Sequence, residues 1–155
     1  MARNKQEMKF CTALKHAFKA KGHFFFKLPD SPSAQRFMIA KPYDATACVN
    51  GASIAIEAKV LKKYEAFGRR HLRETQIKGL DDHARAKGLS YVILEVMAGR
   101  GDYRMLFWRW DHFVKATKNG TIKKSELEAH PYIQRNADES YNIGTLLNEI
   151  DYSTF

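Results

Sequence analysis

The sequence predicts a single α/β domain, and three features support this. The chain has 155 residues, about the length of one domain. Its apolar residues make up 45% of the total, enough to close a core, which excludes a wholly disordered chain. Segments with helical periodicity alternate with strand-like segments, and no long linker separates them. We expect one domain over residues 1–155, with a basic body at 1–124 and an acidic tail at 125–155.

The charge of the chain indicates a polyanionic partner. Twenty-six Lys and Arg residues against seventeen Asp and Glu residues give a net charge of +9, with an isoelectric point near 9.6. Residues 1–124 hold 25 basic and 11 acidic residues, whereas residues 125–155 hold one basic and six acidic residues. A basic excess of this kind is typical of proteins that bind nucleic acid. We therefore expect the nucleic-acid surface in the first four fifths of the chain.

The cysteines and the apolar runs indicate a cytoplasmic protein. Cys11 and Cys48 form neither a disulfide framework nor a CxxC metal pair. The first nine residues, MARNKQEMK, lack the apolar stretch of a signal peptide. The longest apolar run, residues 91–98, is interrupted by Glu95 and is far too short to cross a bilayer. We expect no membrane partner.

The N-terminal segments predict a helix followed by a strand. Apolar residues recur on one stripe over residues 4–20, and Gly22 ends the helix. Glu7 lies within this stripe, either as a partnered site residue or as an exposed carboxylate of the first turn. The following segments are a strand candidate at 23–28, a turn-rich loop at 29–35 and a short strand candidate at 36–40.

A β-hairpin is predicted over residues 44–59, because Asn50-Gly51 is the strongest short-range signal for a two-residue turn. In such a hairpin the numbers of paired residues sum to a constant, so Asp44 lies opposite Glu57. Side chains alternate between the faces of a strand, and Lys59 therefore shares the face of Glu57.

Opposed carboxylates on one face of a sheet repel each other, and a divalent cation between them is the ordinary reason for such a pair. Lys59 adds a positive charge beside Asp44 and Glu57. The alternative is a solvent-facing hairpin with scattered charges, or a bulge that breaks the predicted pairing.

The next segments combine basic and aromatic residues. Residues 61–70 are predicted to form a loop that neutralises phosphates and rests rings on sugars or bases, although its aromatic side chains could instead pack into the core. Residues 71–87 are predicted to form a helix whose apolar stripe contains Gln76, either as a satisfied core amide or as a site residue. The residues expected to contact DNA are Lys62, Lys63, Tyr64, Arg69, Arg70 and Arg73.

The remaining elements complete the α/β pattern. Residues 90–97 form a buried central strand, residues 103–109 another strand, and a helix begins near Asp111. Ser125-x-x-Glu128 matches a capping box for a short helix. An apolar patch in the tail is expected to dock on the body or on a second subunit; it consists of Ile143, Leu146, Leu147 and Ile150.

The order of these motifs resembles that of the PD-(D/E)XK nuclease superfamily. Pro42-Tyr43-Asp44 is followed by Glu57-Ala58-Lys59, thirteen positions after Asp44. Thr75-Gln76 and the segment 123–128 extend the resemblance, which runs from about residue 36 to 155. Within the superfamily, the pattern is most similar to the RecU-type Holliday junction resolvases, relatives of the archaeal Hjc resolvases.

The resemblance implies a fold, a metal site and an assembly. The fold would be a restriction-endonuclease-like mixed central sheet flanked by helices. The family acts as homodimers, and the apolar tail and the strand at 23–28 are the candidate interfaces. The implied catalytic residues are Glu7, Asp44, Glu57, Lys59 and Gln76, and the implied ligands of Mg²⁺, or of Mn²⁺ in its place, are Asp44, Glu57 and the Ala58 carbonyl.

The expected function is therefore Mg²⁺-dependent resolution of four-way DNA junctions by paired nicks, in recombination and repair. A restriction- or repair-type nuclease of the same fold, acting on ordinary duplex, is the first alternative. A basic DNA-binding protein without catalysis is the second. The short chain also suits a phage-encoded protein working in the cytoplasm of a bacterial host.

Overall fold

The computed structural model describes residues 2–29 and 41–153. The strand expected at 36–40 lies outside these residues, as does nearly all of the loop at 29–35. The elements in chain order are α1 (Ala2–Ala20), β1 (Phe24–Lys27), β2 (Ala45–Val49), β3 (Ala52–Leu61), β4 (Phe67–Gly68), a 3₁₀ turn (Arg69–His71), α2 (Glu74–Arg85), β5 (Leu89–Gly99), β6 (Asp102–Arg109), α3 (Trp110–Ala116), β7 (Thr121–Ile122), α4 (Lys124–Ala129), β8 (Ile133–Gln134) and α5 (Gly144–Ser153).

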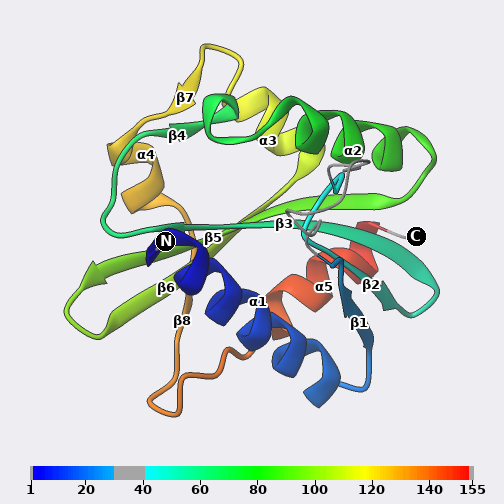
Figure 1. The fold of residues 1–155 in the computed structure, drawn as a ribbon, viewed down its shortest axis with the longest axis horizontal. Helices are drawn as coiled ribbons and strands as arrows, with labels where there is room; N and C mark the ends of the chain where they lie inside the picture. The colour runs from blue at the N-terminus through cyan, green and yellow to red at the C-terminus, as the bar shows by residue number, and fades with distance from the viewer. Residues whose placement is uncertain (1, 30–40, 154–155) are drawn as a thin grey trace, which may run out of the picture.

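The fold class predicted from the sequence is confirmed. A six-stranded sheet has the order β1-β2-β3-β5-β6-β8, and β3 and β5 are its one parallel pair among the described residues. In Figure 1, α1 and α5 lie on one side of this sheet and α2 and α3 on the other. The result is a mixed central sheet flanked by helices. In the described part of the chain, no helix is long and apolar enough to cross a membrane.

The hairpin has the predicted register. Asn50 and Gly51 both have positive φ, as a tight hairpin turn requires, and Ala45 pairs with Ile56. The ladder then stops, and Asp44 lies one residue beyond its end. Its backbone remains anchored, because Asp44 N donates to Ile56 O at 3.0 Å and Asp44 O accepts from Leu28 N at 2.8 Å.

The segment between β3 and α2 differs from the predicted loop and helix. Leu61 still belongs to β3, and Phe67 and Gly68 form β4, which pairs with β7. α2 begins at Glu74 rather than at residue 71, because residues 69–71 form a 3₁₀ turn. Phe67 is fully buried, so for this aromatic the core alternative is the correct one.

Two apolar clusters hold the layers together, one on each face of the sheet. The first joins α1 and α5 to the sheet, and the four apolar residues of the predicted tail patch are buried in it. The second lies under α2 and α3 and includes both tryptophans, Trp108 and Trp110. The tail therefore docks on the body of its own chain, which decides between the two expected docking partners.

Candidate active site

The predicted acidic residues meet where β3 extends beyond the end of its partner β2. β3 continues alongside β5 as far as Leu61, whereas its pairing with β2 ends at Ile56. Glu57 and Lys59 lie on the part of β3 that has no β2 partner, and Asp44 lies directly before β2. We call the place where these three residues meet the notch. Asp44 Oδ2 accepts a hydrogen bond of 2.9 Å from the backbone N–H of Ala58, which ties the two segments together.

Glu57 is the most buried carboxylate of this site, with 0% of its surface exposed. Its Oε2 accepts a hydrogen bond of 2.9 Å from Gln76 Nε2 and lies 3.3 Å from Lys59 Nζ. Its Oε1 has no hydrogen-bond donor among the described residues. Burial raises the pKa of Glu57 well above its usual range, and the nearby Asp44 carboxylate raises this pKa further.

Gln76 lies in the first turn of α2 and points toward the sheet, as its place in the helical stripe predicts. Its Oε1 accepts a hydrogen bond of 2.9 Å from the backbone N–H of Arg73, so its Nε2 is directed at Glu57. α2 lies close to the segment before β2 because Gly79 has no side chain. A Cβ at Gly79 would lie 2.4 Å from the Cβ of Pro42, two residues before Asp44.

Two further residues border the acidic pair without having been predicted there. Lys41 Nζ lies 3.2 Å from Asp44 Oδ1. Cys11 of α1 is buried, and its thiol pKa is raised to about 12 by burial, with the charges of Asp44 and Glu57 among the additional causes. A buried lone cysteine carries no sequence signal for a site, and only the packing of α1 against the sheet places it here.

Glu7 of α1 is the remaining carboxylate that the sequence predicts at this site. It is half-buried on α1, one helical turn before Cys11. Among residues 2–29 and 41–153, no three His, Cys, Asp or Glu side chains gather closely enough to hold a metal ion. The expected role of Glu7 as a site carboxylate stays a prediction.

The donor set nevertheless fits a hard divalent cation. Within the described ranges, one buried oxygen of Glu57 has no donor and lies beside a second carboxylate, and a cation shared by the two would offset both negative charges. Mg²⁺ prefers oxygen ligands and keeps several waters, so two carboxylates and one backbone carbonyl are sufficient protein ligands. Asp44, Glu57 and the Ala58 carbonyl would hold it.

The residues predicted to contact DNA lie on the surface beyond this site. The five basic ones are exposed, and they are Lys62, Lys63, Arg69, Arg70 and Arg73. Tyr64 is half-buried and accepts a hydrogen bond of 3.4 Å from Arg104 Nη1. It is therefore held against the body of the protein rather than projecting freely.

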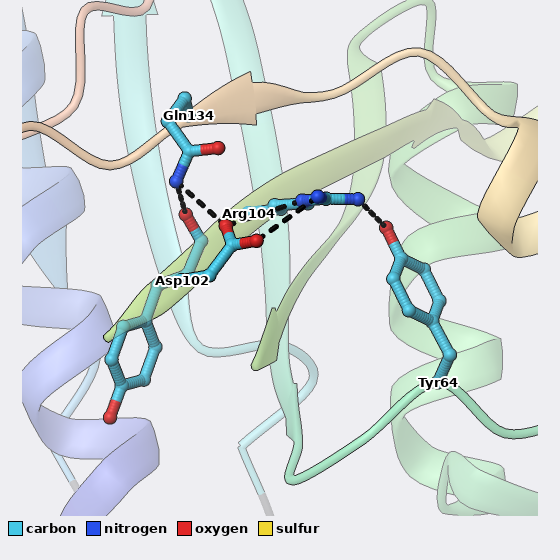
Figure 2. Close-up of polar contacts among 5 residues, drawn as sticks. Tyr64, Asp102, Arg104 and Gln134 are labelled. Carbon is cyan, nitrogen blue, oxygen red and sulfur yellow. Dashed lines mark hydrogen bonds and ion pairs between the residues drawn. The ribbon is translucent and has the colours of Figure 1, made fainter. Parts of the chain in front are cut away.

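Figure 2 shows how Tyr64 is held. Arg104 of β6 also donates to both carboxylate oxygens of Asp102, at 3.0 and 3.3 Å, and Gln134 of β8 donates to Asp102 at 2.9 Å. The Arg104 guanidinium lies 4.3 Å from the ring centroid of Tyr132. The segment after β3 is thus fastened to β6 and β8 by a network that sequence spacing could not reveal.

Comparisons with known proteins find similar solved structures. No family model and no curated protein matches the chain. The chain is similar to the solved structure of Hjc, a Holliday junction resolvase from the archaeal hyperthermophile Archaeoglobus fulgidus. The two are 19% identical, the match covers 67% of this chain and 77% of that chain, and the TM-score is 0.46. The activity of this protein therefore has to be inferred from its own site.

Proposed function

We propose that this protein is a divalent-metal-dependent endodeoxyribonuclease that resolves four-way DNA junctions by paired nicks. One observation carries the proposal: Asp44, Glu57 and Lys59 converge at one notch of the sheet, and Asp44 is bonded to the backbone between the other two. Two carboxylates with an adjacent lysine, in a strongly basic chain, suit hydrolysis of a phosphodiester.

The roles of the individual side chains follow from their positions. A bound Mg²⁺, or Mn²⁺ in its place, would supply Lewis acidity and a more acidic water. Lys59 Nζ lies 3.3 Å from Glu57 Oε2, where it can stabilise the negative charge that develops on the phosphate. Gln76 fixes the orientation of Glu57, since its amide is itself held by the Arg73 backbone. Water would attack phosphorus as the bond to the leaving oxygen breaks.

Paired nicks require two active sites, and we therefore also propose a homodimer. The apolar tail is buried within its own chain and cannot supply the interface. β1 remains as the candidate, because it is an edge strand of the sheet that the described residues form, and Phe24 and Phe26 are 60% and 50% exposed. Light scattering on the purified protein measures the mass directly, and a monomer at working concentration contradicts this part of the proposal.

Two alternatives share much of the evidence. A nuclease acting on ordinary duplex would use the same residues, and a DNA-binding protein without catalysis would need only the basic surface. The buried oxygen of Glu57, which has no hydrogen-bond partner among the described residues, favours the enzymatic interpretations, because a buried carboxylate beside a second one is costly in a protein that has no use for it.

The deciding experiment compares a labelled four-way junction with a linear duplex of the same sequence, with Mg²⁺ or with EDTA. We expect paired, symmetric, Mg²⁺-dependent nicks in the junction alone. Asp44→Asn should abolish them and leave junction binding intact, or tighten it by removing a negative charge near phosphate. Asp82→Asn is the matched control, since Asp82 is an exposed carboxylate of α2.

Each outcome assigns the protein to one class. Equal cutting of junction and duplex would retain the nuclease and reject the resolvase. Tight binding without cutting, by both wild type and Asp44→Asn, would favour the DNA-binding protein. Cutting that survives Asp44→Asn would remove the proposed metal site.

A further inference from the structure

A groove of about 1150 Å³ lies outside the acidic site, between the 3₁₀ turn and the end of α3. Arg69 and Arg70 line one side, and residues within 111–121 line the other, including Lys115 and Lys118. These four cations come from segments more than forty positions apart in the chain. In Figure 1, β4, β7 and α3 lie together on the α2 side of the sheet.

The positive charge of this groove is not neutralised locally. Arg69, Arg70, Lys115 and Lys118 are exposed, and none forms an ion pair with any residue in the described ranges. Asp111 is the acidic residue of the lining, and Arg109 already engages both of its carboxylate oxygens at 2.6 Å. The groove therefore carries a net positive charge that is available to an external anion.

The cations of the neighbouring helix α2 behave differently. Lys78 pairs with Asp82, and Arg85 pairs with Asp81. These two cations of α2 are thus paired within their own helix, unlike the four cations around the groove. Ion pairs within α2 therefore offset part of its positive charge, whereas the groove charges are not offset within the described residues.

The short β4–β7 pair builds the groove. Gly68 pairs with Thr121, and a Cβ at Gly68 would lie 2.3 Å from the carbonyl oxygen of Gly120. The absence of a side chain at Gly68 lets the two backbones touch and brings Arg69 and Arg70 beside the end of α3. The same segment continues to Arg73, whose backbone N–H holds Gln76 at the acidic site. The groove and the site are therefore connected by a few residues of chain.

We propose that this groove binds the phosphodiester backbone of a duplex DNA arm leading into the active site. The inference rests on the proposed function and adds to it a docking surface and the residues that form it, with Lys115 and Lys118 as its new members. Duplex DNA fits because its phosphates form an extended row, and cations on both sides of a groove can contact several of them at once.

The test uses the double substitution Lys115→Gln/Lys118→Gln. The matched control is Lys15→Gln/Lys19→Gln, which removes two exposed lysines from α1 on the opposite face of the sheet. Binding of a labelled junction and a labelled linear duplex is measured by fluorescence anisotropy over a range of salt concentrations, in EDTA so that DNA stays intact. Thermal unfolding of each variant checks that the fold is retained.

We expect the groove variant to bind both DNA molecules roughly tenfold more weakly, and the slope of log K against log salt to fall by about 2, one for each lost phosphate contact. The control variant should change both quantities much less. In cleavage assays below saturating DNA, the groove variant should cut more slowly than wild type, because less of the DNA is bound.

The failure of this inference is distinguishable from that of the proposed function. Wild-type protein that cuts junctions, while both double variants bind equally well or lose equal affinity, would overturn the groove and leave the nuclease standing. Wild-type protein that binds but never cuts would overturn the nuclease, and the comparison of the two variants would still decide the groove.

Discussion

At the scale of single residues, Glu57 is a site residue whose burial opposes the stability of the fold. It is completely buried, close to Asp44, and one of its oxygens has no donor among the described residues. A buried carboxylate of this kind costs free energy of folding unless a cation binds to it. Sites that store such a cost are a recurring feature of functional positions.

Glu57→Gln should therefore stabilise the metal-free protein, by about 1 kcal/mol at neutral pH. The folded-state pKa of Glu57 is raised, so the carboxyl stabilises the fold at low pH and this stability is lost as the pH rises through the folded-state pKa. The advantage of the variant should consequently be larger at about pH 8 than at about pH 5. Urea unfolding at both pH values measures it.

Added Mg²⁺ should reduce the stability advantage of Glu57→Gln over wild type, because Mg²⁺ would bind the folded wild type and not the variant. Asp82→Asn again serves as the control, because Asp82 is an exposed carboxylate. The effect of this substitution on stability should depend little on pH or Mg²⁺. A variant less stable than wild type at both pH values would contradict the interpretation of Glu57 as a costly group.

At the scale of elements, the contact between α2 and the segment before β2 positions the site. Gly79 lies against Pro42, and Gln76 on the same helix reaches Glu57. Helical propensity alone favours alanine over glycine by about 1 kcal/mol. The close contact with Pro42 opposes this gain in stability, since there is no room for a methyl group beside Pro42.

Gly79→Ala should destabilise the protein by about 2 kcal/mol and lower the cleavage rate, because α2 must move away from Asp44 and Glu57. Gly99→Ala is the control, since no atom lies within 4 Å of the place that its added methyl group would take and its φ is not positive. Chemical unfolding and single-turnover cleavage measure the two effects. A stabilised Gly79→Ala protein would show that propensity outweighs the contact.

The elements themselves were predicted with uneven success. The hairpin register and the direction of Gln76 followed from a turn signal and a helical stripe, which are local properties. The short helix predicted near Ser125 is present as α4, but its capping box is not, because Lys123 is the N-cap and Ser125 lies inside the helix. Leu127 of this helix is fully buried.

At the scale of the whole molecule, we predict one cooperative domain over residues 1–155, although its two apolar clusters lie on opposite faces of the sheet. Leu146 of α5 belongs to the first cluster, whereas both tryptophans belong to the second. The tryptophans therefore report on a part of the protein that Leu146 does not touch directly.

Leu146→Ala should lower the free energy of unfolding by about 3 kcal/mol, and the fluorescence transition should shift together with the far-UV circular dichroism transition. The neighbouring Thr145 is exposed, and Thr145→Ala is the control. Transitions that separate, with the tryptophans unaffected, would show that the acidic tail and the first cluster unfold independently of the rest.

Local chemistry in the sequence was enough to bring Asp44 near Glu57, to set Lys59 beside them and to direct Gln76 toward the sheet. These features depend on a two-residue turn and on strand and helix periodicity, which act over a few residues. Only the tertiary structure decided that Cys11 and Lys41 border the site, that Tyr64 is held by Arg104, and that the cations at 69–70 and 115–118 face one groove. Such contacts join segments far apart in the chain, and burial on both faces of the sheet, rather than local pattern, determines them.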